Sequence, residues 1–356
     1  MLKITAGNLL EANVEALVNT VNTEGVMGKG IALQFKQAFP SMYKAYEHDC
    51  RHKLVQLGKV HIYDLGGLVG GPRWIINFPT KGHWRSKSKL SDIATGLRDL
   101  INQVRDLNIR SIAIPPLGCG YGGLNWSDVE PMIRNAFEEL PDVDVQLYAP
   151  SGPPDAATML IKTDRPAITP GRAALIAIVD RYRRGLLDPH VELLEVHKLM
   201  YFLQEAGQKL NLRYEPRAFG PYALNLRQVL IRLEGHYIEG YGDGSDHPRT
   251  KIDLKEGAVE AAASLVTSDA DTVARIERVS SLIEGFEDPY GLELLSSVHW
   301  VMCQNSEARD SAEATIEAVH GWNDRKRRTL KPEHLRSAWT RLKAQGWDSE
   351  ARSAIH

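Results

Sequence analysis

The first 150 residues alternate short apolar runs with longer amphipathic stretches. Apolar runs of the length and residue type of buried strands occupy residues 16–18, 60–63, 74–78, 112–114 and 143–148. Stretches with helical spacing of apolar residues lie between them at 29–38, 41–53, 91–107 and 127–139. In the third stretch, Ile93, Leu97, Leu100, Ile101 and Val104 share one face. The alternation predicts an α/β domain in which helices cover both faces of a mixed sheet.

The pattern changes after residue 150. A cluster of prolines with Gly152 and Gly171 predicts a linker over residues 151–171. Helical spacing then dominates, and helices are expected near 172–185, 190–210, 221–234, 270–285, 289–303, 311–322 and 332–345, with a polar, glycine-rich interruption at 235–250. We therefore expect an α/β domain over 1–150, the linker, and a mostly helical second domain over 172–356.

Composition narrows the class of protein. The chain is 43% hydrophobic and 25% charged, as is typical of a soluble globular protein. Its net charge of −2 argues against a broadly basic nucleic-acid binder but leaves room for a local basic patch. Three cysteines imply no disulfide framework. With no secretory signal pattern and no apolar run of membrane-spanning length, a cytoplasmic protein without membrane contact is expected.

Two glycine-bearing loops, each between an expected strand and an expected helix, indicate the kind of ligand. They cover residues 19–32 and 114–124. Glycine lets backbone approach a ligand closely, and N–H groups at the start of a helix favour anions. Two such loops suggest a clamp on a diphosphate. Asn19 and Asn22 follow the strand and are expected to emerge at the carboxyl edge of the sheet, where open α/β sheets bind ligands. An amide there suits the hydroxyls of a ribose. The alternative is an ordinary strand-to-helix connection with asparagines in turns.

The first loop resembles that of the macrodomains, which bind ADP-ribose. Its pattern is strand, Asn-x-x-Asn, glycines, Gly-Ile-Ala and helix, and the turn Gly7–Leu10 fits the opening turn of the family. Asn8 stands where an aspartate usually pairs with the adenine amino group, so the acceptor is kept without the charge. The resemblance covers about residues 1–150. It implies that the ligand contacts are Asn8, Leu9, Thr20, Val21, Asn22, Gly28, Lys29, Gly30, Ile31, Ala32, Thr80, Gly118, Cys119, Gly120, Tyr121 and Gly122.

The resemblance also implies a role for each group. Asn8 and Leu9 hold the adenine end, and Asn22 orients the distal ribose. The backbone of Gly28–Ala32 and Gly118–Gly122 neutralises the diphosphate, with Tyr121 over the sugar. Thr20, Val21 and Thr80 line the floor.

The second loop also matches the dinucleotide fingerprint through Gly118, Gly120 and Gly123. That fingerprint belongs after the first strand and needs an acidic residue at the end of the next strand. Here the loop follows a late strand, and Glu138 falls within an expected helix. The dinucleotide-binding alternative is therefore disfavoured.

Lys81 ends the apolar run that starts at Trp74. A lysine at a partly desolvated strand end can have a lowered pKa and act as nucleophile or base. The alternative is an ordinary solvated lysine. Thr80-Lys81, together with Gly118-Cys119-Gly120, resembles the macrodomain branch of the terminal ADP-ribose protein glycohydrolase, in which the strand-end lysine is catalytic. In that branch an aspartate follows in the second loop, where this chain has Gly122, so the general acid or base is not assigned.

The chain is still more similar to the macrodomain antitoxins of DarTG toxin–antitoxin pairs. The stretches Asn77–Lys81 and Val21–Ala32 and the two-domain length carry this resemblance. It implies an antitoxin that removes ADP-ribose from single-stranded DNA, most simply from thymidine, and whose helical domain binds a DarT-type ADP-ribosyltransferase toxin. No cofactor or metal is expected. The alternatives are a reader that binds ADP-ribose without cleaving it, or a hydrolase of protein-linked ADP-ribose.

Three further features are assigned ordinary roles. His48 and His52 have a spacing that metals use, but no third ligand accompanies them. Cys119 lacks a neighbouring base in the sequence and is expected to pack as a small apolar residue. The run Arg325–Arg328 is expected to be a solvated helix end, and contact with phosphate is the alternative.

Overall fold

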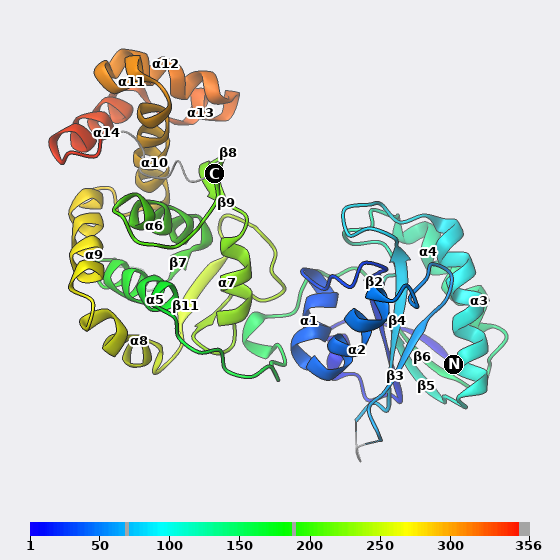
Figure 1. The fold of residues 1–356 in the computed structure, drawn as a ribbon. Helices are drawn as coiled ribbons and strands as arrows, with labels where there is room; N and C mark the ends of the chain where they lie inside the picture. The colour runs from blue at the N-terminus through cyan, green and yellow to red at the C-terminus, as the bar shows by residue number, and fades with distance from the viewer. Residues whose placement is uncertain (68–70, 187–189, 349–356) are drawn as a thin grey trace. The chain divides into compact units, whose positions relative to one another are not determined.

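The computed structural model describes residues 1–67, 71–186 and 190–348 as two compact units (Figure 1). The first unit comprises Met1–Asp164 with Gly242–Ser245, and the second comprises the remainder. Residues 349–356, which the second-domain prediction includes, lie outside the described residues.

A six-stranded sheet forms the centre of the first unit, in the order β1-β6-β5-β2-β4-β3. Its strands are β1 (Leu2–Thr5), β2 (Ala16–Asn22), β3 (His61–Asp64), β4 (Trp74–Lys81), β5 (Ser111–Ile114) and β6 (Asp144–Tyr148). Only β3 runs antiparallel to its neighbour in this sheet. The sheet is therefore mixed, as predicted.

Helices cover both faces of this sheet (Figure 1). They are α1 (Gly30–Ala38), α2 (Pro40–Arg51), α3 (Leu90–Asp106) and α4 (Trp126–Phe137), with the short 3-10 helices η1 (Leu9–Glu11) and η2 (Ala156–Thr158). Successive side chains of a strand point to opposite faces. Ala16 and Val18 of β2 accordingly join the core under α3 and α4, whereas Leu17 and Val21 join the core under α1 and α2. The predicted layering is confirmed.

One glycine sets how closely α3 approaches the sheet. A Cβ atom on Gly96 would lie 2.4 Å from the buried ring of Phe78 on β4. No side chain fits at that position unless the ring moves. The glycine weakens the helix locally but lets it pack directly on the strand that ends in Lys81.

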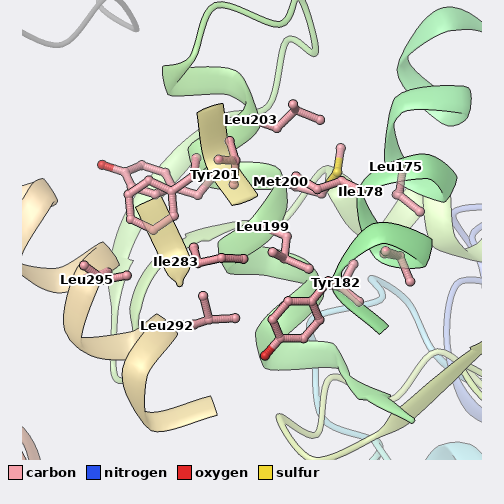
Figure 2. Packing of buried hydrophobic residues seen from close by; sticks show 14 of the residues in the cluster. Leu175, Ile178, Tyr182, Leu199, Met200, Tyr201, Leu203, Ile283, Leu292 and Leu295 are labelled. Atoms are coloured by element: carbon pink, nitrogen blue, oxygen red, sulfur yellow. The ribbon is translucent and has the colours of Figure 1, made fainter. Parts of the chain in front are cut away.

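The second unit is mostly helical, as predicted. Its helices are α5 (Pro170–Arg183), α6 (Leu193–Glu205), α7 (Leu226–Leu233), α8 (Ala258–Thr267), α9 (Ala270–Ile283), α10 (Pro289–Gln304), α11 (Ser306–Asp310), α12 (Ala312–Trp322), α13 (Asp324–Thr329) and α14 (Pro332–Ala344). Figure 2 shows part of its core, where Leu175 and Ile178 of α5 lie near Leu199 and Met200 of α6. All eight residues 196–203 of α6 are buried.

Small strands of the second unit were not expected. They are β7 (Val191–Glu192), β8 (Tyr214–Arg217), β9 (Gly220–Ala223), β10 (Ile238–Glu239) and β11 (Lys251–Leu254). The helix expected near 221–234 begins only at Leu226, because the preceding residues pair as the β8–β9 hairpin. Helices α8, α11 and α13 were also missed. Their apolar faces are short, so the spacing of apolar residues was not enough to predict a helix at these positions.

The basic run Arg325–Arg328 is not simply a solvated helix end, so that prediction was wrong. Lys326 is fully buried, and its ammonium lies 2.8 Å from both Glu293 and the Ser297 hydroxyl. Arg325 donates two hydrogen bonds to the same carboxylate, at 2.6 and 3.0 Å. Although burial opposes ionisation, these cations hold the pKa of Glu293 below its usual value. Half of the run therefore anchors α13 to α10.

Candidate functional site

The two asparagines after the first apolar run have different positions. Strand β2 continues to Asn22, four residues beyond the predicted run. Asn19 therefore lies inside the sheet, fully buried, and its amide donates to the side-chain oxygen of Asn77 on β4 at 2.9 Å. The expectation that Asn19 emerges at the carboxyl edge was wrong. Only Asn22 reaches that edge.

Asn22 organises the first loop. Its side-chain oxygen accepts hydrogen bonds from the backbone N–H of Glu24 at 2.9 Å and of Val26 at 3.3 Å. Its amide nitrogen donates to the carbonyl of Val26 at 2.6 Å. One amide hydrogen therefore remains for another acceptor. The predicted contact with a ribose stays a prediction, and the structure assigns this side chain a loop-forming role as well.

Lys81 ends β4 directly beside Asn22, because the two residues are paired across the parallel strands. Its ammonium donates to the backbone carbonyl of Tyr121 at 3.3 Å, so it lies between the ends of the strands and the second loop. Partial burial lowers the pKa of Lys81. Such a lysine is closer to a neutral amine near pH 7 than a solvated one is, and it remains half-exposed to a ligand.

The two glycine-bearing loops meet at Tyr121. A Cβ atom on Gly30, at the start of α1, would lie 3.3 Å from the ring of Tyr121. The Lys29 ammonium lies 5.6 Å from the centre of the same ring. Gly30 has φ +59°, a conformation that glycine adopts without strain. Tyr121 is 59% exposed, so its side chain can be reached by a sugar or a base.

Gly122 has no room for a side chain. A Cβ atom there would lie 2.3 Å from the Ser88 hydroxyl and 2.4 Å from the carbonyl oxygen of Gly118. The neighbouring Ser88 is buried, and its backbone N–H donates to the Gly122 carbonyl at 2.9 Å. The aspartate of the related branch is therefore not merely absent but sterically excluded from this position.

The expected adenine end lies at η1. Asn8 caps this short helix by accepting from the backbone N–H of Leu10 at 3.1 Å. Its amide donates to Glu11 at 3.0 Å. Leu9 is buried in the core under α1 and α2.

The remaining residues predicted to contact the ligand differ in how far they are buried. Val21 and Thr80 are buried, and the Thr80 hydroxyl donates to the carbonyl of Val21 at 3.3 Å. Ile31 and Ala32 are half-buried and pack against the core under α1 and α2. Thr20 and Gly28 are half-buried, whereas Gly118 is buried and Gly120 is exposed.

Cys119 is not set up as a nucleophile. Burial, reinforced by the charge of Asp128, raises the pKa of its thiol to about 11. The side chain packs against the core under α3 and α4, as expected of a small apolar residue.

The second unit contains a separate pocket of about 440 Å³. Leu193, Phe219 and Tyr222 contribute to its wall, together with the buried His197 and Lys198. Burial lowers the pKa of His197 to about 3. Burial and the charge of Lys326 lower the pKa of Lys198 to about 7, and its ammonium donates to the Pro221 carbonyl at 2.7 Å. No motif in the sequence indicated this pocket.

Comparisons with known proteins agree with the geometry of the first unit. The Macro domain family model matches residues 18–133. A DNA ADP-ribosyl glycohydrolase of Thermus aquaticus is 46% identical over 97% of this chain and 94% of its own length. The chain belongs to the DNA ADP-ribosyl glycohydrolase family. Its first unit is the macrodomain.

Two further similar proteins each match 42% of this chain. A DNA ADP-ribosyl transferase–DNA ADP-ribosyl glycohydrolase fusion protein of Thermosipho africanus is 33% identical over 42% of this chain and 42% of its own length. The solved macrodomain of Mycobacterium tuberculosis DarG is 56% identical, covers 42% of this chain and 99% of its own, and has a TM-score of 0.42. The family resemblance inferred from the sequence is confirmed by the relative of Thermus aquaticus, and the Macro domain family model agrees with it.

Within the described ranges, no three His, Cys, Asp or Glu side chains gather as a metal site would require. The helices that the structure describes include none with the length and apolarity to cross a membrane.

Proposed function

We propose that this glycohydrolase removes ADP-ribose from DNA by hydrolysing the bond between the anomeric carbon of the distal ribose and a base nitrogen. Water supplies the oxygen that ends on the anomeric carbon, and the base nitrogen takes a proton. The reaction needs no cofactor. The observation that carries the proposal is Lys81, which lies at the end of β4 between Asn22 and the carbonyl of Tyr121. The family membership supplies the DNA substrate class.

Lys81 has two chemical routes. As a neutral amine it attacks the anomeric carbon and forms a covalent intermediate that water then hydrolyses. As an ammonium it stabilises negative charge on the departing base. Partial burial, which lowers the pKa of Lys81, supports the first route by raising the fraction of neutral amine. Because Gly122 excludes an aspartate, neither route uses a carboxylate at that position.

The loops around Lys81 bind the rest of the ADP-ribose. The glycine-rich backbone of Gly28–Ala32 and Gly118–Gly122 takes the diphosphate, since exposed N–H groups suit an anion. Tyr121 covers the distal ribose, Asn22 orients it, and Asn8 and Leu9 hold the adenine. Thymidine is the proposed modified nucleoside, single-stranded DNA the proposed substrate, and the cytoplasm the proposed location.

The second unit is proposed to bind the partner DarT-type ADP-ribosyltransferase. The named fusion protein joins a transferase to a glycohydrolase in one chain, which supports a functional pairing of the two activities. The second unit supplies apolar surface for such a contact at the exposed Leu224, which contributes to the 440 Å³ pocket. Together, the two units make the protein an antitoxin that both repairs the lesion and restrains its source.

The test is direct. The full chain is incubated with a single-stranded oligonucleotide carrying ADP-ribosylated thymidine and, in parallel, with a protein ADP-ribosylated on glutamate. Free ADP-ribose is measured by mass spectrometry. Release from the DNA with intact oligonucleotide as the second product is expected. Binding of free ADP-ribose without release from either substrate would identify a reader instead. Release from the protein alone would identify a hydrolase of protein-linked ADP-ribose.

A further inference from the structure

The segment that follows Lys81 is attached to both ligand loops. The carbonyl of Gly82 accepts hydrogen bonds from the backbone N–H and the hydroxyl of Thr23, each at 3.0 Å. At the other end, the N–H of Ser88 donates to the Gly122 carbonyl at 2.9 Å. Residues 82–88, the bridge segment, therefore connect the first loop to the second. The segment begins at the residue that follows the proposed catalytic lysine.

The bridge segment presents three adjoining planar groups. Trp84 is 42% exposed and belongs to neither core of the first unit. The His83 ring lies 5.3 Å from the Trp84 ring, centre to centre, at an interplanar angle of 30°. The Arg85 guanidinium lies 4.4 Å from the centre of the Trp84 ring. An exposed tryptophan beside a cation, attached at both ends to a ligand site, indicates a contact surface rather than packing.

The charge of this region is one-sided. No aspartate or glutamate occurs between Asp64 and Asp92, whereas five lysines and arginines do, in a chain of net charge −2. Arg85, Lys87 and Lys89 are exposed, and none of them forms an ion pair with a described residue. The positive charge is therefore available to an anionic partner.

Aromatic rings combined with unpaired cations are the means by which proteins hold single-stranded nucleic acid: bases stack on the rings, and the cations contact phosphates. In a duplex the bases are already stacked on one another, so a tryptophan platform favours the single strand. We propose that Trp84 and Arg85 form a platform for the strand that flanks the modified nucleotide. A neighbouring base stacks on Trp84, and Arg85 and Lys87 contact the phosphates. This inference rests on the proposed function and extends it from the ADP-ribose to the DNA chain.

The chain supplies a matched control at the other end of the same strand. The guanidinium of Arg73 lies 4.6 Å from the centre of the Trp74 ring at the start of β4, and Arg73 pairs with Asp64 at 3.4 Å. Arg73→Ala removes the same charge and the same type of contact, but far along the strand from Lys81. The test variants are Trp84→Ala, Trp84→Phe and Arg85→Ala in the full chain.

The first measurement is kcat/KM on an ADP-ribosylated single-stranded oligonucleotide and on ADP-ribosylated thymidine alone. Trp84→Ala should lower the ratio of the two values by about tenfold, as expected when one base loses its stacking partner. Trp84→Phe should recover most of the loss, and Arg73→Ala should leave the ratio unchanged. An equal loss on both substrates would overturn the proposal, because Trp84 would then serve the ADP-ribose or the fold. An unchanged ratio would overturn it as well.

The second measurement is independent of hydrolysis. Binding of unmodified short oligothymidylate to the parent and the variants is followed by fluorescence anisotropy as the salt concentration is raised. Trp84→Ala should weaken binding about tenfold. Arg85→Ala should lower the slope of log affinity against log salt by about 0.7, the value for one lost phosphate contact on a single strand. Binding that is insensitive to both substitutions would refute the platform even if hydrolysis is confirmed. If the parent releases no ADP-ribose yet binds oligothymidylate through Trp84, the proposed function fails and the platform stands.

Discussion

The two units each contain a lysine whose pKa is lowered by burial and whose ammonium donates to a backbone carbonyl. Lys81 ends a strand in the first unit and contacts Tyr121, whereas Lys198 lies within α6 of the second unit and contacts Pro221. The shift is larger at Lys198, which is only 1% exposed. By pKa alone the second lysine would be the better catalytic candidate. The accessibility of the ammonium to a ligand therefore matters more than the size of the pKa shift, because Lys81 is half-exposed between two glycine-bearing loops.

The largest effect is expected from Lys81→Ala, which tests whether Lys81 is the catalytic lysine. We expect kcat on ADP-ribosylated DNA to fall by roughly 10²–10³-fold, which is the typical cost of removing one group that acts in the transition state. The Kd for free ADP-ribose should stay within about tenfold, or ~1.4 kcal/mol. Single-turnover release of ADP-ribose and calorimetric titration measure the two quantities. Lys59→Ala, at an exposed lysine, serves as the control.

Two outcomes of this experiment carry further information. A Lys81→Ala variant that turns over like the parent would reduce Lys81 to an ordinary strand-end lysine. A borohydride-trapped adduct on Lys81 in the parent would select the nucleophilic route over charge stabilisation. The same variant, co-expressed with the transferase toxin, should still protect cells through the second unit. Loss of protection would mean that hydrolysis is the only antidote.

The second prediction concerns Lys198 and pH. Its pKa is about 7 in the folded chain and near 10.5 when unfolded, so between these values the unfolded state binds one more proton. The free energy of unfolding therefore rises with pH across this window, by up to about 1.4 kcal/mol per pH unit, and is unaffected by this group below pH 7. Lys198→Met should remove that rise and leave turnover of ADP-ribosylated DNA unchanged.

Denaturant titrations of the parent and of Lys198→Met at pH 7 and pH 9 measure this effect. Taking the difference between the two proteins at each pH cancels every group that both share. A difference that does not change with pH would show that Lys198 stays protonated in the folded state. A lowered pKa would then no longer be a property that the two lysines share.

The smallest effects are expected on the free energy of unfolding, from alanine substitutions at two helical glycines, one in each unit. Gly96→Ala in α3 should lower the free energy of unfolding by about 1–3 kcal/mol, because the new methyl group overlaps the Phe78 ring. Gly321→Ala in α12 should instead raise it by about 0.4–1 kcal/mol, since a Cβ atom there meets nothing within 4 Å. Denaturant titration measures both. Stabilisation by Gly96→Ala would show that α3 can retreat from the sheet without cost.

The sequence predicted the macrodomain better than it predicted the second unit. Apolar runs located the interior strands of the sheet but not the edge strand β1. The position of Lys81 at a strand end follows directly from the apolar run before it. The burial of Asn19 was not predicted because a polar amide after an apolar run usually indicates the end of the strand. The partner that satisfies this amide, Asn77, lies 58 residues away in the sequence. The same limit hid the pairing of Lys326 with Glu293, since a run of basic residues is indistinguishable from a solvated helix end until the partner helix is placed.

The contribution of Ser88 could not be predicted for the same reason. Nothing in the stretch Lys87-Ser88-Lys89 marks a buried serine among exposed cations. Only the structure shows its hydroxyl against the second loop. Trp84 was likewise overlooked, although a tryptophan within an acid-free basic stretch was visible in the sequence and could have been singled out.

The contact between Ser88 and Gly122 constrains the evolutionary history of this site. A single replacement of Gly122 by aspartate introduces the carboxylate of the related branch, but it also drives a Cβ atom into the Ser88 hydroxyl and the Gly118 carbonyl. A change at Ser88 to glycine relieves only the first overlap, so the loop backbone must also shift. The substitutions are therefore mutually dependent, and their order along a lineage matters. An aspartate at position 122 is therefore expected to be tolerated only together with changes at Ser88 and in the loop backbone.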